Sequence, residues 1–72
     1  METITTDDRE MYKRYIVVEG DHCVIVTYDV EFRKIDTGRY INGGETSCGS
    51  KQFKTLTGAF RASEKWLLSV RH

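Results

Sequence analysis

The sequence predicts a small α+β protein, in which an antiparallel three-stranded β-meander carries one C-terminal amphipathic helix packed on one face. Three observations lead to this prediction. Residues 12–35 are rich in β-branched and aromatic side chains, a glycine-first turn interrupts them at Gly20-Asp21, and apolar residues recur at three- and four-residue spacing from Leu56 onward. A chain of 72 residues has room for one hydrophobic core, so a single domain spanning 1–72 is expected.

The N-terminal residues predict little regular structure. Residues 1–6 are mostly polar and are expected to be frayed. Thr6 is followed by acidic residues, a pattern that favours a helix N-terminus. A short helix from Asp7 to about Met11 is therefore a further expectation.

The strongest local signal is the pair Gly20-Asp21. Glycine tolerates the positive φ that a two-residue type II′ turn requires at its first central position. The pair therefore predicts a hairpin between a strand Tyr12–Glu19 and a strand His22–Ile35. The pairs expected across it are Val18 with Cys23, Val17 with Val24, Ile16 with Ile25 and Tyr15 with Val26.

Alternation of side chains divides the second strand into two faces. The face expected in the core carries Val24, Val26, Tyr28, Val30 and Phe32, and the other carries Thr27, Asp29, Glu31 and Arg33. Near the turn, the second face is too apolar for a surface that meets only water. We expect a partner chain, the N-terminal segment or a second subunit to cover it. The residues of this predicted protein interface are Ile16, Val18, Cys23 and Ile25.

The following residues predict a turn, a short strand and a loop. Asp36-Thr37-Gly38 is typical of a turn, and Arg39–Asn42 is expected to be the third strand. Residues 42–50 contain three glycines without periodicity, which predicts a loop. A brief extended stretch at Lys51–Lys54 is expected before the helix.

The C-terminal third predicts an amphipathic helix whose apolar side faces the sheet. Thr55 or Thr57 is expected to cap its N-terminus. Replacement of Trp66 by alanine is expected to cost about 3–5 kcal/mol. The apolar stripe consists of Leu56, Ala59, Phe60, Ser63, Trp66, Leu67 and Val70.

The residues that carry chemistry do not form a catalytic or metal-binding pattern. Between Gly44 and Lys51 the sequence resembles a phosphate-binding loop, but lysine and serine are transposed and no helix follows directly. The soft metal ligands are few, and neighbouring His22 and Cys23 point to opposite sides of a strand. We therefore predict a protein that is not an enzyme, without a metal, a cofactor or a small-molecule substrate.

Charge and composition leave the partner open. The chain has eleven basic and eleven acidic residues. Residues 1–36 hold five bases and nine acids, so their net charge is −4, whereas residues 37–72 hold six bases and two acids, which gives +4. The basic second half permits a surface that binds polyanions. The bases predicted to contact nucleic acid are Arg33, Lys34, Arg39, Lys51 and Lys54.

The expected location is the cytoplasm, because the N-terminus lacks a secretory pattern and no apolar run approaches the length of a membrane helix. A reducing compartment would keep both cysteines as thiols. A bridge between Cys23 and Cys48 stays open as the alternative.

One motif suggests a nucleic-acid-binding relative. Three strands followed by Phe53-x-Thr55-x-x-x-Ala59-x-x-Ala62-x-x-x-Trp66-Leu67 resemble the arm-binding domain of phage-type integrases. The resemblance implies that the sheet lies in the DNA major groove and that the C-terminal helix backs it. Arg14, Thr27 and Arg33 match the polar and basic side chains that this face needs, whereas Asp29 and Glu31 depart from the pattern.

Two functions are therefore expected from the sequence. The first is a non-catalytic protein-interaction module, acting as a regulator, inhibitor or adaptor, as accessory proteins of phages and mobile elements do. A homodimer fits this hypothesis, because so short a chain gains stability from association. The alternative is a nucleic-acid-binding domain that uses the basic second half.

Overall fold

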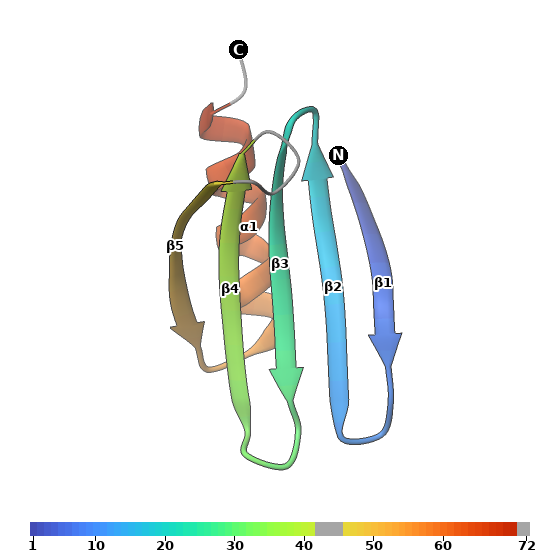
Figure 1. The fold of residues 1–72 in the computed structure, drawn as a ribbon. Coiled ribbons are helices and arrows are strands. Elements are labelled where there is room, and N and C mark those ends of the chain that lie inside the picture. The colour runs from blue at the N-terminus through green and yellow to red at the C-terminus, as the bar shows by residue number, and fades with distance from the viewer. Residues whose placement is uncertain (42–45, 71–72) are drawn as a thin grey trace.

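The computed structural model describes residues 1–41 and 46–70, except for the side chains of residues 46–50. The chain forms a five-stranded antiparallel sheet followed by one helix (Figure 1), which confirms the predicted α+β class. The strands lie in the sheet in the same order as in the sequence, so the sheet is a meander. The elements are β1 (Glu2–Asp8), β2 (Tyr12–Glu19), β3 (His22–Asp29), β4 (Lys34–Ile41), β5 (Thr46–Phe53) and α1 (Leu56–Val70).

The hairpin of β2 and β3 forms in the predicted register. Gly20 has a φ of 60°, which a side chain would make unfavourable. All four predicted pairs are present, from Val18 opposite Cys23 to Tyr15 opposite Val26. A tight turn thus fixes which side chains of both strands share a face.

The predicted strand His22–Ile35 is in fact two strands joined by a turn. Arg33 adopts a φ of 53°, and Asp29 Oδ1 accepts a hydrogen bond from the backbone N–H of Phe32 at 3.3 Å. This aspartate stabilises a turn that has no glycine or proline to mark it. Phe32, expected in the core, is therefore 71% exposed. Val30, also expected in the core, lies in the same turn and its N–H donates to the carbonyl of Met11 at 3.0 Å.

The turn predicted at Asp36-Thr37-Gly38 is wrong, because these residues lie inside β4. Gly38 pairs with Ile25 on one side and Ser50 on the other. A Cβ placed on Gly38 would lie 3.0 Å from Cε2 of Tyr40, so the tyrosine ring occupies the space above the glycine. This glycine permits close packing within a strand and does not reverse the chain.

Both segments predicted to be irregular contain edge strands, so the sheet has five strands and not three. Residues 1–6 were expected to be frayed and a helix was expected from Asp7, but β1 pairs with β2 from Glu2 to Asp8. β5 pairs with β4 over most of the predicted loop. The pairing register shifts between Thr5 and Asp7 in the β1–β2 pair and between Arg39 and Tyr40 in the β4–β5 pair. Each shift interrupts the alternation of side chains along an edge strand, as is common at sheet edges. Residues 42–45 of the predicted loop lie outside the described residues.

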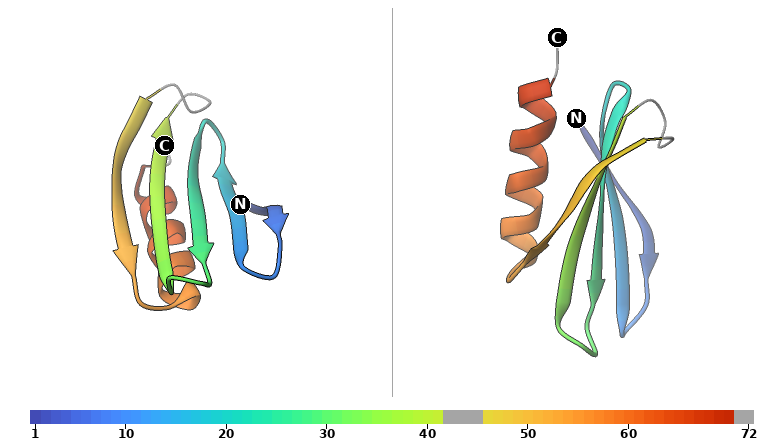
Figure 2. Two further views of the ribbon diagram at one scale, coloured as in Figure 1. Left: turned by 60° about the horizontal axis from the view of Figure 1, so that its bottom comes forward. Right: turned by 60° about the vertical axis from the view of Figure 1, so that its left-hand side comes forward.

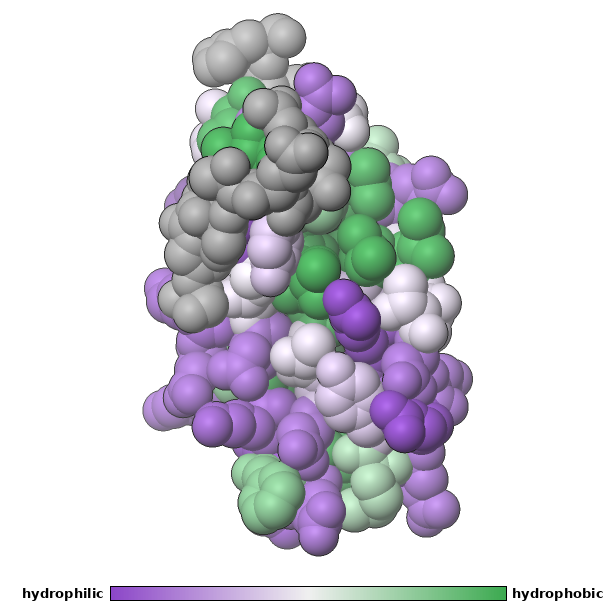
Figure 3. Space-filling model, in the orientation of Figure 1, coloured by the Kyte–Doolittle hydropathy of each residue, from purple (hydrophilic) through white to green (hydrophobic). Residues whose placement is uncertain are grey.

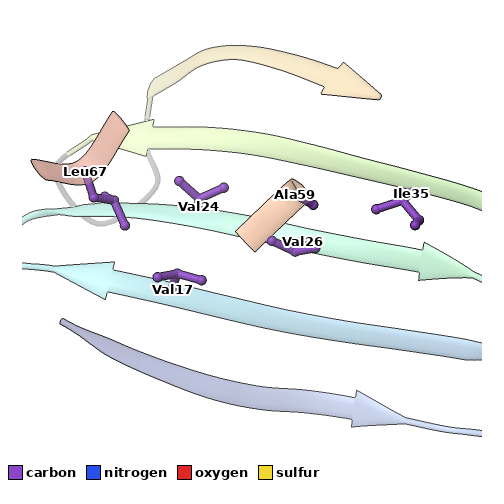
Figure 4. Packing of buried hydrophobic residues seen from close by; sticks show 6 residues of the cluster. All are labelled: Val17, Val24, Val26, Ile35, Ala59 and Leu67. Atoms are coloured by element: carbon purple, nitrogen blue, oxygen red, sulfur yellow. The ribbon is translucent and has the colours of Figure 1, made fainter. Parts of the chain in front are cut away.

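The core lies between α1 and one face of the sheet. The helix contacts β2, β3, β4 and β5, and Figure 2 shows it on one side only. Ser63 is buried in this layer, and its hydroxyl donates to the carbonyl of Ala59 at 2.7 Å, so its polar atom is satisfied. Leu56, Phe60 and Trp66 pack around the centre, which confirms the predicted stripe. The fully apolar centre consists of Val17, Val24, Val26, Ile35, Ala59 and Leu67 (Figure 4).

The N-terminus of α1 is capped by Thr55 and not by Thr57. The Thr55 hydroxyl accepts a hydrogen bond from the N–H of Gly58 at 3.0 Å, and the Thr55 carbonyl accepts one from Ala59 at 3.1 Å. A side-chain acceptor at this position satisfies one of the N–H groups that have no partner in the first turn.

Truncation of Leu67 to alanine should remove about 2–5 kcal/mol from the free energy of unfolding, because this side chain is 0% exposed at the helix–sheet contact. Leu68→Ala is the matched control. Leu68 is 52% exposed, so its truncation should change stability by less than about 0.5 kcal/mol. Urea unfolding of both variants measures the two values, and equal losses would contradict the described packing of α1.

Removal of the cap in Thr55→Ala should cost about 1 kcal/mol, because the N–H of Gly58 then loses its acceptor. Thr57→Ala removes the same atoms from an exposed neighbour and should be neutral within about 0.5 kcal/mol. Chemical denaturation distinguishes the two. A larger loss for Thr57→Ala would show that the cap has been assigned to the wrong residue.

Candidate functional site

The face of the sheet opposite α1 is apolar at one end. Alternation along β2 and β3 places Ile16, Val18, Cys23 and Ile25 on this face, with Ile16 directly opposite Ile25 and Val18 opposite Cys23. All four side chains remain partly exposed. The structure thus brings together the four residues that the sequence predicted as a protein interface.

Two further residues, which the sequence analysis missed, extend this apolar area. Ile4 of β1 lies opposite Ile16 and is 43% exposed, and Tyr40 of β4 lies opposite Cys23. Ile4 stands between Thr3 and Thr5, a short β-branched run that was a signal for a strand. The open-face patch is therefore defined here as Ile4, Ile16, Val18, Cys23, Ile25 and Tyr40.

The patch occupies the end of the sheet near the β2–β3 turn. Figure 3 shows apolar side chains gathered there, mostly polar side chains across the rest of the face, and separate pale green groups at the far end. A hollow of about 300 Å³ indents the patch beside the turn. It is lined by Ile16, Val18, Gly20, Asp21, His22 and Cys23.

The polar end of the same face carries both signs of charge. Lys34 lies directly opposite Asp29, and Asp36 lies opposite Thr27, which in turn neighbours Arg14. Opposite charges side by side give this end no strong preference for anions or cations. It therefore differs from the uniformly basic surface that contact with phosphates favours.

Cys23 is the thiol within the open-face patch. Partial burial raises the pKa of this thiol, because the apolar surroundings disfavour the thiolate. A raised pKa is the opposite of what a catalytic nucleophile requires. The side chain of Cys48 is outside the described residues, and so is the predicted alternative of a bridge between the two.

The five bases predicted to contact nucleic acid separate into two groups. Arg33 and Lys34 lie at the β3–β4 turn. Lys54 belongs to the same group, because it follows Phe53, the last residue of β5, and Phe53 pairs with Ile35 next to Lys34. Arg39 and Lys51 lie on the face that carries α1, because both line a hollow with residues of the helix. The predicted set is therefore distributed over two sites.

The hollow that contains Arg39 and Lys51 has a volume of about 390 Å³ and lies between α1 and strands β4 and β5. Arg39 stacks on the Trp66 indole, with its guanidinium carbon 5.3 Å from the ring centroid. The sequence analysis placed Trp66 in the core stripe and did not single out Lys65. This feature is called the basic groove, and its lining residues are Arg39, Lys51, Ala62, Lys65, Trp66 and Ser69.

Comparison of the chain with protein-family models, with curated proteins and with solved structures finds no match. The resemblance to an integrase arm-binding domain stays a prediction. Within residues 1–41 and 46–70, no helix has the length and apolar character to cross a membrane. The fold and its surfaces thus define a small α+β protein with an apolar patch on its open sheet face and a basic groove beside its helix.

Alkylation should report the environment of Cys23. Because the thiolate is the nucleophile and burial raises the pKa of Cys23, the folded protein should react more slowly near neutral pH than the same protein in urea. Its rate should also reach half of the maximum at a higher pH. Iodoacetamide kinetics across pH, measured in a Cys48→Ser background, test this. A midpoint pH of the folded protein that is equal to or lower than that of the unfolded chain would contradict the assignment.

Proposed function

We propose that this chain is a small non-catalytic protein-interaction module, acting as a regulator, inhibitor or adaptor, and that the open-face patch is its docking surface. The observation that supports this proposal is the position of the six patch residues on the sheet face that α1 leaves open. An antiparallel sheet with one covered face normally presents polar side chains on the other. Contiguous apolar surface of this kind is typical of an interface.

A second copy of the chain is the partner that we propose first. The formal net charge is zero, so two copies do not repel each other at long range. Packing of the two open faces would give four layers, helix, sheet, sheet and helix, which is how two antiparallel sheets bury a shared apolar face. Both signs of charge lie beside the patch, as in Asp29, Lys34 and Asp36. In a two-fold dimer, acidic residues of one copy can therefore face basic residues of the other.

A lysine at the centre of the patch should prevent this association. Ile25→Lys introduces a charge into the proposed interface, which should weaken dimerisation by about thirtyfold or more, since a buried interface residue contributes about 2 kcal/mol. Leu68→Lys is the matched control, because it puts the same charge in place of an apolar side chain of α1 that is 52% exposed, on the opposite side of the sheet from the patch. Sedimentation equilibrium over a concentration series measures the dissociation constants of both variants and of the wild type.

Accessibility of Cys23 provides a second measurement. Dimerisation should protect this thiol from alkylation as protein concentration rises, in parallel with the mass. A wild type that stays monomeric with Cys23 equally reactive at every concentration would refute self-association. Equal weakening by Leu68→Lys and Ile25→Lys would show that the patch is not the docking surface.

A further inference from the structure

The basic groove concentrates positive charge on its described lining. Among the six lining residues that the structure describes, three are cations, from β4, β5 and α1, and none is acidic. On the helix, Ala62, Lys65, Trp66 and Ser69 follow the spacing that places side chains along one flank. Glu64 does not share that spacing and does not line the groove. The described lining residues therefore carry a charge of +3 in a chain whose formal net charge is zero.

The cations of the groove also differ from those of the β1–β2 hairpin. There, Arg9 binds Asp7 with nitrogen and oxygen 2.9 Å apart, and Lys13 binds Asp8 at 2.6 Å. Arg39, Lys51 and Lys65 form no such pair with any side chain in the described part of the chain. Their charge is therefore not neutralised by a described carboxylate.

Aromatic rings hold two of these cations in place. The guanidinium of Arg39 lies over Trp66, and the ammonium of Lys51 lies 5.5 Å from the centroid of Phe53. His22 contacts Trp66 edge-on, with the ring centroids 5.9 Å apart, which fixes the indole from a second side. A cation–π contact orients a cation and leaves free the N–H donors that point away from the ring. In the described part of the chain, no side chain accepts a hydrogen bond from Arg39 or Lys51, so these donors can reach an external acceptor.

We propose that the basic groove binds a phosphate ester through Arg39, Lys51 and Lys65. Arginine presents a planar fork of N–H donors that matches two phosphate oxygens, and lysine ammoniums add point charges around it. The Ser69 hydroxyl already donates to the carbonyl of Trp66 at 2.7 Å, so the cations are the principal donors. This site is on the opposite face of the sheet from the open-face patch and does not depend on the function proposed for that patch.

The phosphate ester has two possible sources, a free nucleotide or the backbone of a nucleic-acid strand. Both present the same oxygens to the groove. A strand would also reach basic residues beyond it, and its binding would weaken steeply as salt concentration rises. A nucleotide would depend on the groove alone. The two sources can therefore be separated by affinity and by salt dependence.

Trp66 provides a direct signal, because it is the single tryptophan of the chain and lines the groove. Its fluorescence should change saturably when the full-length protein is titrated with pyrophosphate, adenosine monophosphate or a single-stranded oligonucleotide. Isothermal titration calorimetry gives a measurement that does not depend on the indole. Tighter and more salt-sensitive binding of the oligonucleotide would identify a strand as the source, and equal affinities would identify a nucleotide.

Two variants test the groove itself. Arg39→Gln and Lys51→Gln should each weaken binding of every phosphate ligand by at least about tenfold, because each removes a charged hydrogen-bond donor. Arg9→Gln is the matched control, since it removes the same charge from an exposed residue of the β1–β2 turn, outside the groove, and should leave affinity unchanged within about twofold. Circular dichroism and thermal unfolding establish that all three variants fold.

The proposal is overturned by either of two results. The first is the absence of any saturable fluorescence or calorimetric response up to about 10 mM ligand, ten times the dissociation constant of a millimolar site. The second is a loss of affinity in Arg9→Gln equal to that in Arg39→Gln, which would show attraction by overall charge and not by this groove. Loss confined to the two groove variants supports the assignment.

Discussion

The contact between the apolar stripe of α1 and one face of the sheet determines the rest of the structure. Leu67 and Ala59 meet Val17, Val24 and Val26 in a layer with no exposed side chain. One helix can cover only one face of a sheet, so this contact leaves the opposite face of all five strands open. Because the turn at Gly20 fixes the register of β2 and β3, the residues that alternate with the core are necessarily the ones on the open face. The core and the open-face patch are thus two consequences of one pairing.

The sequence carried enough information to predict the central hairpin and the helix. A glycine suited to positive φ predicts a turn, and apolar residues at helical spacing predict a helix. Both patterns can be recognised from a few neighbouring residues of the sequence. Val18, Cys23 and their neighbours were assigned to the correct face for this reason. The turn after Asp29 was missed, because it depends on an aspartate bonded to the N–H of Phe32 and on a positive φ at Arg33, neither of which interrupts the apparent alternation.

The edge strands were harder to predict, because much of their stability comes from long-range pairing. The segment from Glu2 to Asp8 is mostly polar and its local strand signal is the short β-branched run around Ile4, yet its backbone groups bond to β2. Gly38 had the composition of a turn, but the Tyr40 ring above it makes it part of a strand. The basic groove was only partly predictable. Arg39 and Lys51 were identified from charge, whereas Lys65 and Trp66 join them only through the packing of α1 against β4 and β5.

Cations in the two halves of the sequence contact different kinds of group. In the acidic half, Arg9 and Lys13 are bound to neighbouring aspartates of the β1–β2 hairpin, and their pKa values are raised by these hydrogen bonds. In the basic half, Arg39 and Lys51 rest on aromatic rings instead. An aromatic partner positions a cation without cancelling its charge, whereas a carboxylate does both. The described cations of the basic groove therefore have no carboxylate partner among the described residues, while the open face carries the apolar patch. The sheet separates these two surfaces, so the two proposals that rest on them can be tested independently.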